Sequence, residues 1–283
     1  LLYLYDSYKG IARDHDPVRY ALFVSFFPHL LAGPILYHRQ MMHQFSEEKL
    51  RRFDWENFAR GAALFAIGLA KKVLIADALA LYVNDSWGHL GALSLFSGWL
   101  TAIAYMLQLY FDFSGYSDMA VGLARMMNLS IPVNFKAPYR AASIIAFWQR
   151  WHITLGAWMR DYVFYPFALT RPMQRLAKSA RRAFGADVAR ALPAALGNIL
   201  VFLLVGVWHG ATGNYVAWGL YNGLILAASA LLEPAYRRFG ERHARLVKSR
   251  GFYGFRMIRT FVIVNIGWYF DRALRAGDAF AML

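Results

Sequence analysis

The stretch "FWQRWHITLGAWMRDY", residues 147–162, holds three tryptophans, a histidine, two arginines and an aspartate. Apolar sequence lies on both sides of it. A charged side chain at the centre of a bilayer costs about 2.5–3.5 kcal/mol on insertion scales, so such groups usually face a cavity or each other. The stretch therefore predicts a functional or structural role for its ionisable groups, and for His152 in particular.

The composition is typical of a membrane protein. Of the 283 residues, 58% are hydrophobic and 17% are charged, whereas a soluble domain carries roughly 25% charged residues. The apolar residues form runs of a length that suits a bilayer about 30 Å thick. We expect an all-α, polytopic transmembrane protein in which residues 1–283 form a single membrane domain. The chain has no cysteine, which excludes disulfides, thiol nucleophiles and cysteine metal sites.

Several segments of the chain are predicted to be helical spans, and others interrupt them. Residues 20–37 are apolar but contain Pro28, Gly33 and Pro34, which favours a kinked or re-entrant segment. Residues 38–57 are polar and predict a surface helix, and residues 128–143 predict irregular structure. The expected spans are 58–83, 92–127, 144–168, 191–212, 214–233 and 256–275.

The net charge of +14 raises the possibility of nucleic-acid binding, but the positions of the charges argue against it. Residues 171–190 carry six Lys/Arg and residues 236–259 carry eight, and both segments are short and lie between apolar spans. The positive-inside rule places such segments in the cytoplasm. The "HGATGN" turn at 209–214 then faces outward. The chain begins without Met and stops just after an apolar span, so we expect it to be truncated at both ends.

Three groups of polar side chains lie within the apolar sequence. On a continuous helix over 144–168, Arg150, Thr154, Ala157 and Asp161 would share one stripe, and Trp148, His152, Leu155, Gly156 and Met159 another. Arg150 and Asp161 would then each need a partner on another segment, with Asp112 and Asp118 as candidates for Arg150. The three groups are Asp112, Ser114, Tyr116 and Asp118; Gln149, Arg150, His152, Arg160 and Asp161; and His209 with Asn214.

The residues alone leave two interpretations open for each histidine. His152 is either a core histidine bonded to a carbonyl or a group beside Gly156 where a ligand approaches. His209 lies either at an interfacial turn or at an outward-facing site where a neutral imidazole acts as a general base. No G-x-S-x-G motif supports a serine hydrolase. His38 and His43 are five residues apart, which does not fit H-E-x-x-H, and no metal site is predicted.

Four stretches occur in an order that resembles the membrane-bound O-acyltransferase (MBOAT) family. They are "FFPHLLAGPILYHRQ", "YFDFSGYSDMAVGLARMM", "NFKAPYRAASIIAFWQRWHITLGAWMRDYVFYP" and "GVWHGATGNYVAWGLYNG". The match resembles the bacterial branch, which includes the alginate O-acetylation membrane subunit and the D-alanyl transfer protein of teichoic acids. "LAGPI" and "IGWYFDRAL" are more similar to the polysaccharide acetylation subgroup, although Asp271 stands where many relatives have a second aromatic residue.

The resemblance implies a function and a set of site residues. His209 resembles the catalytic histidine of the family, and His152 resembles the second one, so we expect the two to face each other across a central chamber surrounded by broken helices. The residues expected to wall, line or hold that chamber are Trp148, Trp151, Trp208, Arg150, Arg160, Asp161, Asn214, Asp112 and Asp118.

The resemblance also implies the partners. We expect a multi-pass O-acyltransferase in the bacterial inner membrane, surrounded by lipid, that takes an acyl group from a cytoplasmic thioester such as acetyl-CoA. No permanently bound cofactor is expected. The acceptor would be a hydroxyl of an extracytoplasmic polysaccharide or of a partner relay protein. The alternatives are D-alanyl transfer to a teichoic-acid-type polymer and, in another class, a transporter or flippase, which inverted repeats would favour; the sequence shows none.

Overall fold

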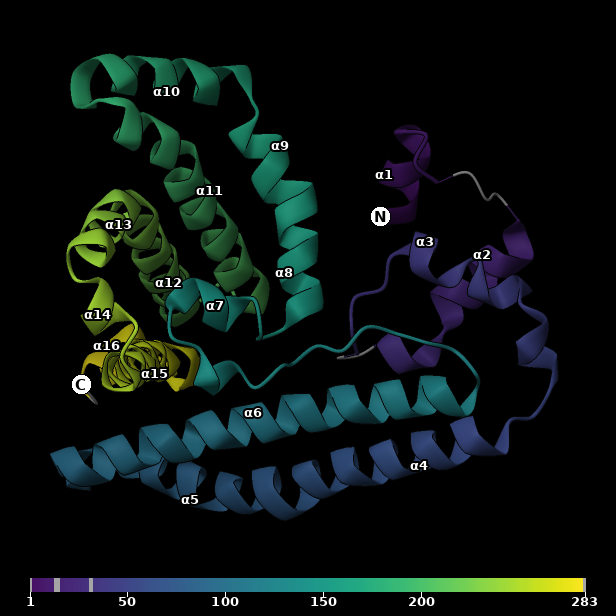
Figure 1. The fold of residues 1–283 in the computed structure, drawn as a ribbon. Coiled ribbons are helices and arrows are strands. Elements are labelled where there is room, and N and C mark those ends of the chain that lie inside the picture. The colour runs from purple at the N-terminus through teal and green to yellow at the C-terminus, as the bar shows by residue number, and fades with distance from the viewer. Residues whose placement is uncertain (1, 13–15, 31–32, 282–283) are drawn as a thin grey trace. The chain divides into compact units, whose positions relative to one another are not determined.

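The computed structural model describes residues 2–12, 16–30 and 33–281, and every regular element in these residues is a helix (Figure 1). The internal contacts divide the chain into two compact units. Unit 1 comprises Leu1–Leu81, Leu107–Lys136 and His152–Leu155, and unit 2 comprises Tyr82–Met106, Ala137–Trp151 and Gly156–Leu283. The helical fold class is therefore confirmed, and the single membrane domain stays a prediction.

Unit 1 contains α4 (Trp55–Ala70), the start of α5 (Asp77–Gly88) and the second part of α6 (Leu95–Met126). Helix α4 begins at Asp54, whose side chain accepts the Asn57 N–H at 2.9 Å and so caps the first turn. A π-helical stretch, Lys71–Ala76, joins α4 to α5. Helix α6 follows after the short turn η5 (Leu90–Ala92). The expected segments 58–83 and 92–127 are thus helical, with an unexpected π-helical turn at the two lysines.

Glycines set the distance between α4 and α6. A Cβ atom on Gly68 would lie 2.5 Å from the carbonyl oxygen of Gly115, and one on Gly61 would lie 2.6 Å from that of Gly122. Small residues at such positions allow two helix backbones to approach closely, as in many membrane proteins. The two helices therefore pack backbone against backbone along this contact.

The amino-terminal part of unit 1 corrects one prediction. Residues 38–57 do not form a surface helix, because the chain here makes short turns whose inner side is buried. Gln44 is 5% exposed, and its side chain exchanges two hydrogen bonds with the backbone of Ser130, at 2.9 and 2.8 Å. The elements are α1 (Leu2–Tyr8), α2 (Pro17–Ser25), η1 (Phe27–His29), α3 (His38–Met41), η2 (Gln44–Ser46) and η3 (Glu48–Arg51).

The break predicted near Pro28 is confirmed. Helix α2 ends at Ser25, and a short 3₁₀ turn containing Pro28 follows it. Leu31 and Ala32, within the same predicted segment, lie outside the described residues. Residues 127–137 contain no helix and lead to η6 (Pro138–Arg140), as the prolines predicted.

Two packed helices, α11 (Ala186–His209) and α12 (Gly213–Leu231), form the centre of unit 2. They run antiparallel and approach closely at two glycines. A Cβ atom on Gly206 would lie 2.4 Å from the carbonyl oxygen of Tyr215, and one on Gly219 would lie 2.5 Å from that of Phe202. The other elements are α7 (Ile144–Trp148), α8 (Ile153–Met159, begun in unit 1), η7 (Arg160–Phe164), α9 (Tyr165–Ala168), α10 (Arg171–Phe184), α13 (Glu233–Arg242), α14 (Ala244–Val247), α15 (Arg250–Arg272) and α16 (Ala276–Ala281).

Length and composition identify a limited number of membrane-crossing helices. Among the described helices, α11 alone is long and apolar enough, and α12 with α13 passes the same test as a pair bent by 51°. Helices are present at the other predicted spans, although the segment 144–168 is divided between α7, α8, η7 and α9. Their crossing of a bilayer stays a prediction. The basic segments 171–190 and 236–259 are largely helical rather than open loops. They lie in α10, the start of α11, α13, α14 and the start of α15.

Candidate functional site

His209 is the last residue of α11, directly before the turn that leads to α12. Its side chain is exposed, and its ring stacks on Tyr215 with 5.9 Å between ring centroids. A Cβ atom on Gly210 would lie 2.6 Å from the Tyr215 ring, so glycine at this position lets the tyrosine come close. The sequence thus places an accessible imidazole at a helix end, against an aromatic wall.

A tryptophan cluster adjoins this imidazole. The Trp218 ring lies 5.5 Å from the His209 ring and 5.9 Å from that of Trp148. Trp268 of α15 completes the cluster at 6.4 Å from Trp218 and 5.1 Å from Trp151. The predicted residues Trp148 and Trp151 therefore belong to the aromatic cluster beside His209.

Trp208 has a different environment from these tryptophans. Its side chain is 62% exposed, whereas Trp218 and Trp268 are each 3% exposed. Its ring nevertheless lies 4.9 Å from that of His209. Trp208 therefore contacts His209 from the outer side of α11, and the cluster contacts it from the inner side.

The buried cluster has hydrogen-bond donors without acceptors. Among the described residues, the indole N–H groups of Trp148, Trp218 and Trp268 are buried and have no partner. Buried polar groups in proteins nearly always have a hydrogen-bond partner. Three such donors in one cluster next to His209 could bind polar atoms of a ligand or water. Trp218 and Trp268 were not among the residues predicted from the sequence. Their positions could have indicated them, because Trp218 follows Asn214 by four residues and Trp268 precedes Asp271 by three.

A carboxylate faces the same end of unit 2. Asp271, near the end of α15, accepts a hydrogen bond from the Tyr105 hydroxyl at 2.6 Å. The short distance is typical of a charge-assisted O–H···O⁻ bond. Asp271 lies within electrostatic range of His209, although no hydrogen bond or ion pair between these two described residues is present. The only sequence signal for Asp271 was its departure from the aromatic residue of many relatives, and nothing in the sequence pointed to Tyr105.

Asn214 fixes the turn after His209. It is 4% exposed, and its side-chain amide donates to the carbonyl oxygens of Ala273 and Phe270 at 2.8 and 3.3 Å. These bonds tie the start of α12 to the end of α15. Asn214 therefore positions the turn that carries His209, and its place in a chamber lining stays a prediction.

The surroundings of His152 correct the helical stripes that the sequence predicted. Helix α7 ends at Trp148 and α8 begins at Ile153, so residues 149–152 form a break. His152 itself has φ of +45°, a left-handed conformation that would interrupt a continuous helix. Because of this break, neither the Arg150–Asp161 stripe nor the Trp148–Met159 stripe exists.

The His152 ring nitrogen Nδ1 lies 3.2 Å from the side-chain oxygen of Asn134. The same oxygen accepts the Thr154 hydroxyl at 2.8 Å and the Thr154 N–H at 3.2 Å. Asn134 is 1% exposed, and the Phe113 ring packs edge-on against His152 at 4.7 Å. An oxygen acceptor at Nδ1 fixes the orientation of the ring and directs Nε2 away from Asn134.

Lysines, rather than Arg150, pair with the two predicted aspartates. Lys71 lies 2.5 Å from Asp118, and Lys72 lies 2.5 Å from Asp112. Both pairs join the π-helical turn to α6, and the side chains of the first are 26% and 27% exposed. Asp112 and Asp118 therefore stabilise the contact between two helices of unit 1.

The remaining predicted charges lie in unit 2. Arg160 donates to its neighbour Asp161 at 2.9 Å, so these two residues are paired within one segment. The Arg150 side chain has no ion pair with any described residue. His152 belongs to unit 1 and His209 to unit 2, and the expectation that they face each other across a chamber stays a prediction.

Comparison with known proteins identifies relatives over nearly the whole chain. It is 39% identical over 264 residues to a peptidoglycan O-acetyltransferase of Helicobacter pylori, covering 93% of this chain and 45% of the relative. It is 37% identical over 272 residues to a probable alginate O-acetylase of Pseudomonas aeruginosa, covering 96% and 46%. A teichoic acid D-alanyltransferase of Bacillus subtilis is 28% identical over 269 residues, covering 93% and 64%.

The chain spans about half the length of the first two relatives. The family described as "MBOAT, membrane-bound O-acyltransferase family" matches residues 3–185. This range includes His152 and the tryptophans beside it, and it ends before His209. The match covers more than half of the chain, which therefore belongs to the membrane-bound O-acyltransferase family.

Proposed function

We propose that this chain is part of a multi-pass inner-membrane enzyme that transfers an acetyl group from a cytoplasmic thioester, such as acetyl-CoA, to a hydroxyl. The acceptor is an extracytoplasmic polysaccharide or a partner protein that relays the group. Membership of the family supports acyl transfer, and the relatives at 39% and 37% identity are named for O-acetylation. The 28% identity to a D-alanyltransferase makes D-alanyl transfer the second candidate.

His209 acts as the general base in this proposal. Its neutral imidazole takes the proton of the acceptor hydroxyl while the hydroxyl oxygen attacks the thioester carbonyl carbon. The new C–O bond forms, the C–S bond breaks, and the leaving thiolate takes the proton back from the imidazolium. The chain has no cysteine and no evident activated serine, which favours this direct transfer over a covalent acyl-enzyme.

One observation carries the assignment of His209. Its imidazole is exposed at a helix end, stacks on the Tyr215 ring and lies 5.5 Å from the Trp218 ring, whose buried indole N–H has no partner among the described residues. Asp271, which the Tyr105 hydroxyl holds at 2.6 Å, lies within electrostatic range of this imidazole. A nearby negative charge stabilises the imidazolium that forms when the base takes a proton. Asp271 is therefore a positioning residue in this proposal, and Tyr105 orients it. His152 supports the reaction from the oxygen-bonded orientation that Asn134 imposes.

Substitution of the histidines in the full-length protein tests the proposal. Removal of a general base typically lowers a rate by about 10²–10⁴, so His209→Ala should abolish measurable transfer of labelled acetyl groups in membranes, with normal membrane insertion. His152→Ala should also be severely impaired in transfer. The double variant should be only slightly less active than the less active single variant, because the effects of groups that act as a unit are not additive.

His89→Ala and His243→Ala serve as matched controls. Both residues are histidines outside the proposed site, and each side chain is exposed, so both variants should retain transfer. Transfer at the normal rate by His209→Ala would refute the role of His209. If the unmodified protein transfers a group from a D-alanyl donor but not from acetyl-CoA, the result would favour D-alanyl transfer, the second candidate.

A further inference from the structure

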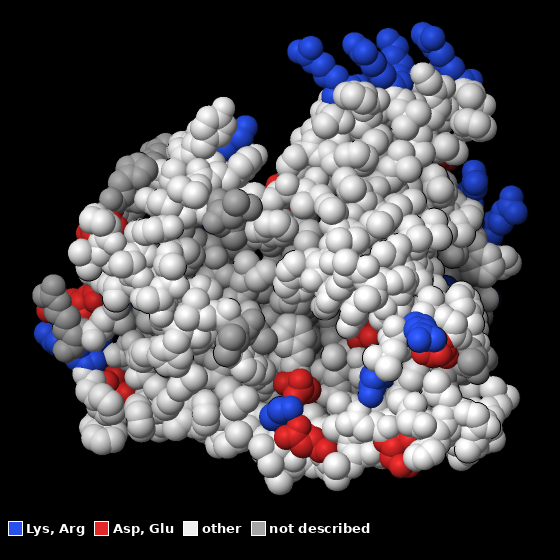
Figure 2. All heavy atoms as spheres, turned by 180° about the vertical axis from the view of Figure 1, so that it is seen from behind, with Lys and Arg blue, Asp and Glu red and all other residues white. Residues whose placement is uncertain are grey.

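Basic side chains gather over α10. The helix sequence RPMQRLAKSARRAF contains five Lys/Arg and no acidic residue. Figure 2 shows this as a row of blue side chains over α10 along the upper edge of the molecule. At 100° per residue the basic residues fall on one face of the helix, and Met173, Leu176, Ala180 and Phe184 fall on the other.

The apolar face of α10 is only partly covered. Met173 and Ala180 are each 6% exposed, whereas Leu176 is 44% and Phe184 is 72% exposed. A helix with a strongly basic face and exposed apolar side chains is typical of one that lies in the interface of a bilayer. In a protein of a membrane-bound family, lipid is the expected cover for these side chains.

A pocket of about 360 Å³ lies between α10 and α11. Three alanines, Ala177, Ala186 and Ala189, leave space beneath three basic side chains. Gly185 joins the two helices with φ of +87°, a conformation that favours glycine, and so brings the end of one helix to the start of the next. The basic side chains are Lys178, Arg181 and Arg190.

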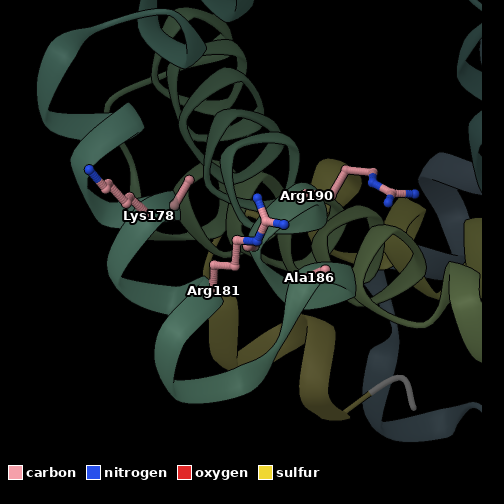
Figure 3. A pocket seen from close by; sticks show the side chains of 6 residues that line it. Lys178, Arg181, Ala186 and Arg190 are labelled. Atoms are coloured by element: carbon pink, nitrogen blue, oxygen red, sulfur yellow. The ribbon is translucent and has the colours of Figure 1, made fainter.

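The three cations lack acidic partners. Within the described residues, no ion pair or side-chain hydrogen bond joins Lys178, Arg181 or Arg190 to another side chain. Figure 3 shows Arg181 reaching from α10 toward α11, whereas Lys178 and Arg190, on either side of it, point away from it. All three are exposed, so the outer two can rotate toward a group bound at Arg181. Guanidinium groups bind phosphate oxygens in bidentate fashion.

We propose that this pocket binds the phosphate of an anionic phospholipid headgroup. The charge of the pocket is complementary to phosphate, and the exposed Leu176 and Phe184 place acyl chains beside it. Phosphatidylglycerol carries one net negative charge on its phosphate, whereas phosphatidylcholine has a compensating cation. The pocket therefore selects the anionic lipid.

The test uses the full-length protein with a fluorophore on a single cysteine at Ser179, an exposed position of α10. The protein is reconstituted in vesicles of phosphatidylcholine with increasing brominated phosphatidylglycerol, which quenches the fluorophore on contact. Quenching by brominated phosphatidylcholine gives the reference. Each basic residue near an anionic surface strengthens binding severalfold, so we expect a preference of about tenfold or more for phosphatidylglycerol.

Three sets of substitutions separate the pocket from the general basic surface. Lys178→Gln, Arg181→Gln and Arg190→Gln together should reduce the preference to near unity. Arg171→Gln, Arg175→Gln and Arg182→Gln remove the same charge from outside the pocket, so they should weaken the general attraction to the anionic surface but leave a clear preference for phosphatidylglycerol. Lys178→Arg keeps the charge and adds a guanidinium group, so it should preserve the preference, which controls for folding.

Several results would overturn the proposal. One is the absence of any preference in the unmodified protein, and another is an equal loss in the two glutamine variants, which would indicate diffuse attraction. A third is displacement of the quenching lipid by coenzyme A or inorganic phosphate at constant ionic strength, which would indicate a site for a soluble phosphate. None of these results depends on acyl transfer, so they leave the proposed activity untouched.

Discussion

Removal of one hydroxyl tests whether Asp271 assists His209. Tyr105→Phe deletes the donor that lies 2.6 Å from the Asp271 carboxylate and preserves the ring. A hydrogen bond to a charged group contributes about 1.5–3 kcal/mol, so the free energy of unfolding should fall by about that amount. If the bond also holds Asp271 toward His209 during the reaction, a loss of about 1.5 kcal/mol in the transition state lowers the transfer rate about tenfold.

Tyr269→Phe is the matched control. The Tyr269 hydroxyl also joins α15 to α6, but it donates to the carbonyl oxygen of Gly98 at 3.2 Å and does not contact Asp271. Loss of this neutral bond should lower the free energy of unfolding by about 1 kcal/mol and leave the transfer rate per folded molecule unchanged. The two variants therefore differ in the transfer rate per folded molecule, which only Tyr105→Phe should lower.

The assay measures two quantities on the full-length protein. Thermal unfolding in detergent gives the stability of each variant, and transfer of labelled acetyl groups gives kcat and KM per folded molecule. Tyr105→Phe and Asp271→Asn should lower kcat with little change in KM, and Asp271→Glu should partly restore it. An unchanged kcat in both Tyr105→Phe and Asp271→Asn would refute the positioning role and leave the pair a purely structural contact.

Two further predictions concern packing and topology. Gly68→Ala should destabilise the protein by about 1–3 kcal/mol in detergent melting, because the new methyl group would meet the Gly115 carbonyl oxygen at 2.5 Å. The control Gly254→Ala, with nothing within 4 Å, should be neutral or stabilising. Equal changes in the melting of the two variants would contradict the close contact at Gly68. In intact cells an impermeant thiol reagent should label a single cysteine at Thr212 but not one at Ser179, because the positive-inside rule places α10 in the cytoplasm. The reverse pattern would invert the topology.

The sequence predicted the helices that apolar periodicity and length define. The helix end at His209 and the glycine-rich turn after it, the long helix over 92–127 and the irregular segment 128–143 were all expected and are present. These features depend on local properties, such as the proline that ends a helix and the glycine that permits a turn. The resemblance to the family also depended on the order of short motifs, which can be read directly from the sequence.

The break at residues 149–152 shows a limit of local reasoning. The stretch has the composition of a continuous helix, but His152 adopts φ of +45°. Its ring and Thr154 both bond the side-chain oxygen of Asn134, a residue from an irregular segment 18 positions earlier in the chain. Hydrogen bonds to a distant residue thus compensate for a backbone conformation that local preference disfavours.

The sequence by itself determined the helical class and the family, because both follow from residue types and their order, whereas the catalytic roles of His152 and His209 stay predictions. Only the tertiary structure decided the partners of the charged groups. Lys71 and Lys72, rather than Arg150, bond Asp118 and Asp112, and Tyr105 reaches Asp271 across 166 positions of the chain. An ion pair or a charge-assisted hydrogen bond needs its two atoms within a few ångströms, and that proximity depends on how helices pack, which no local pattern records.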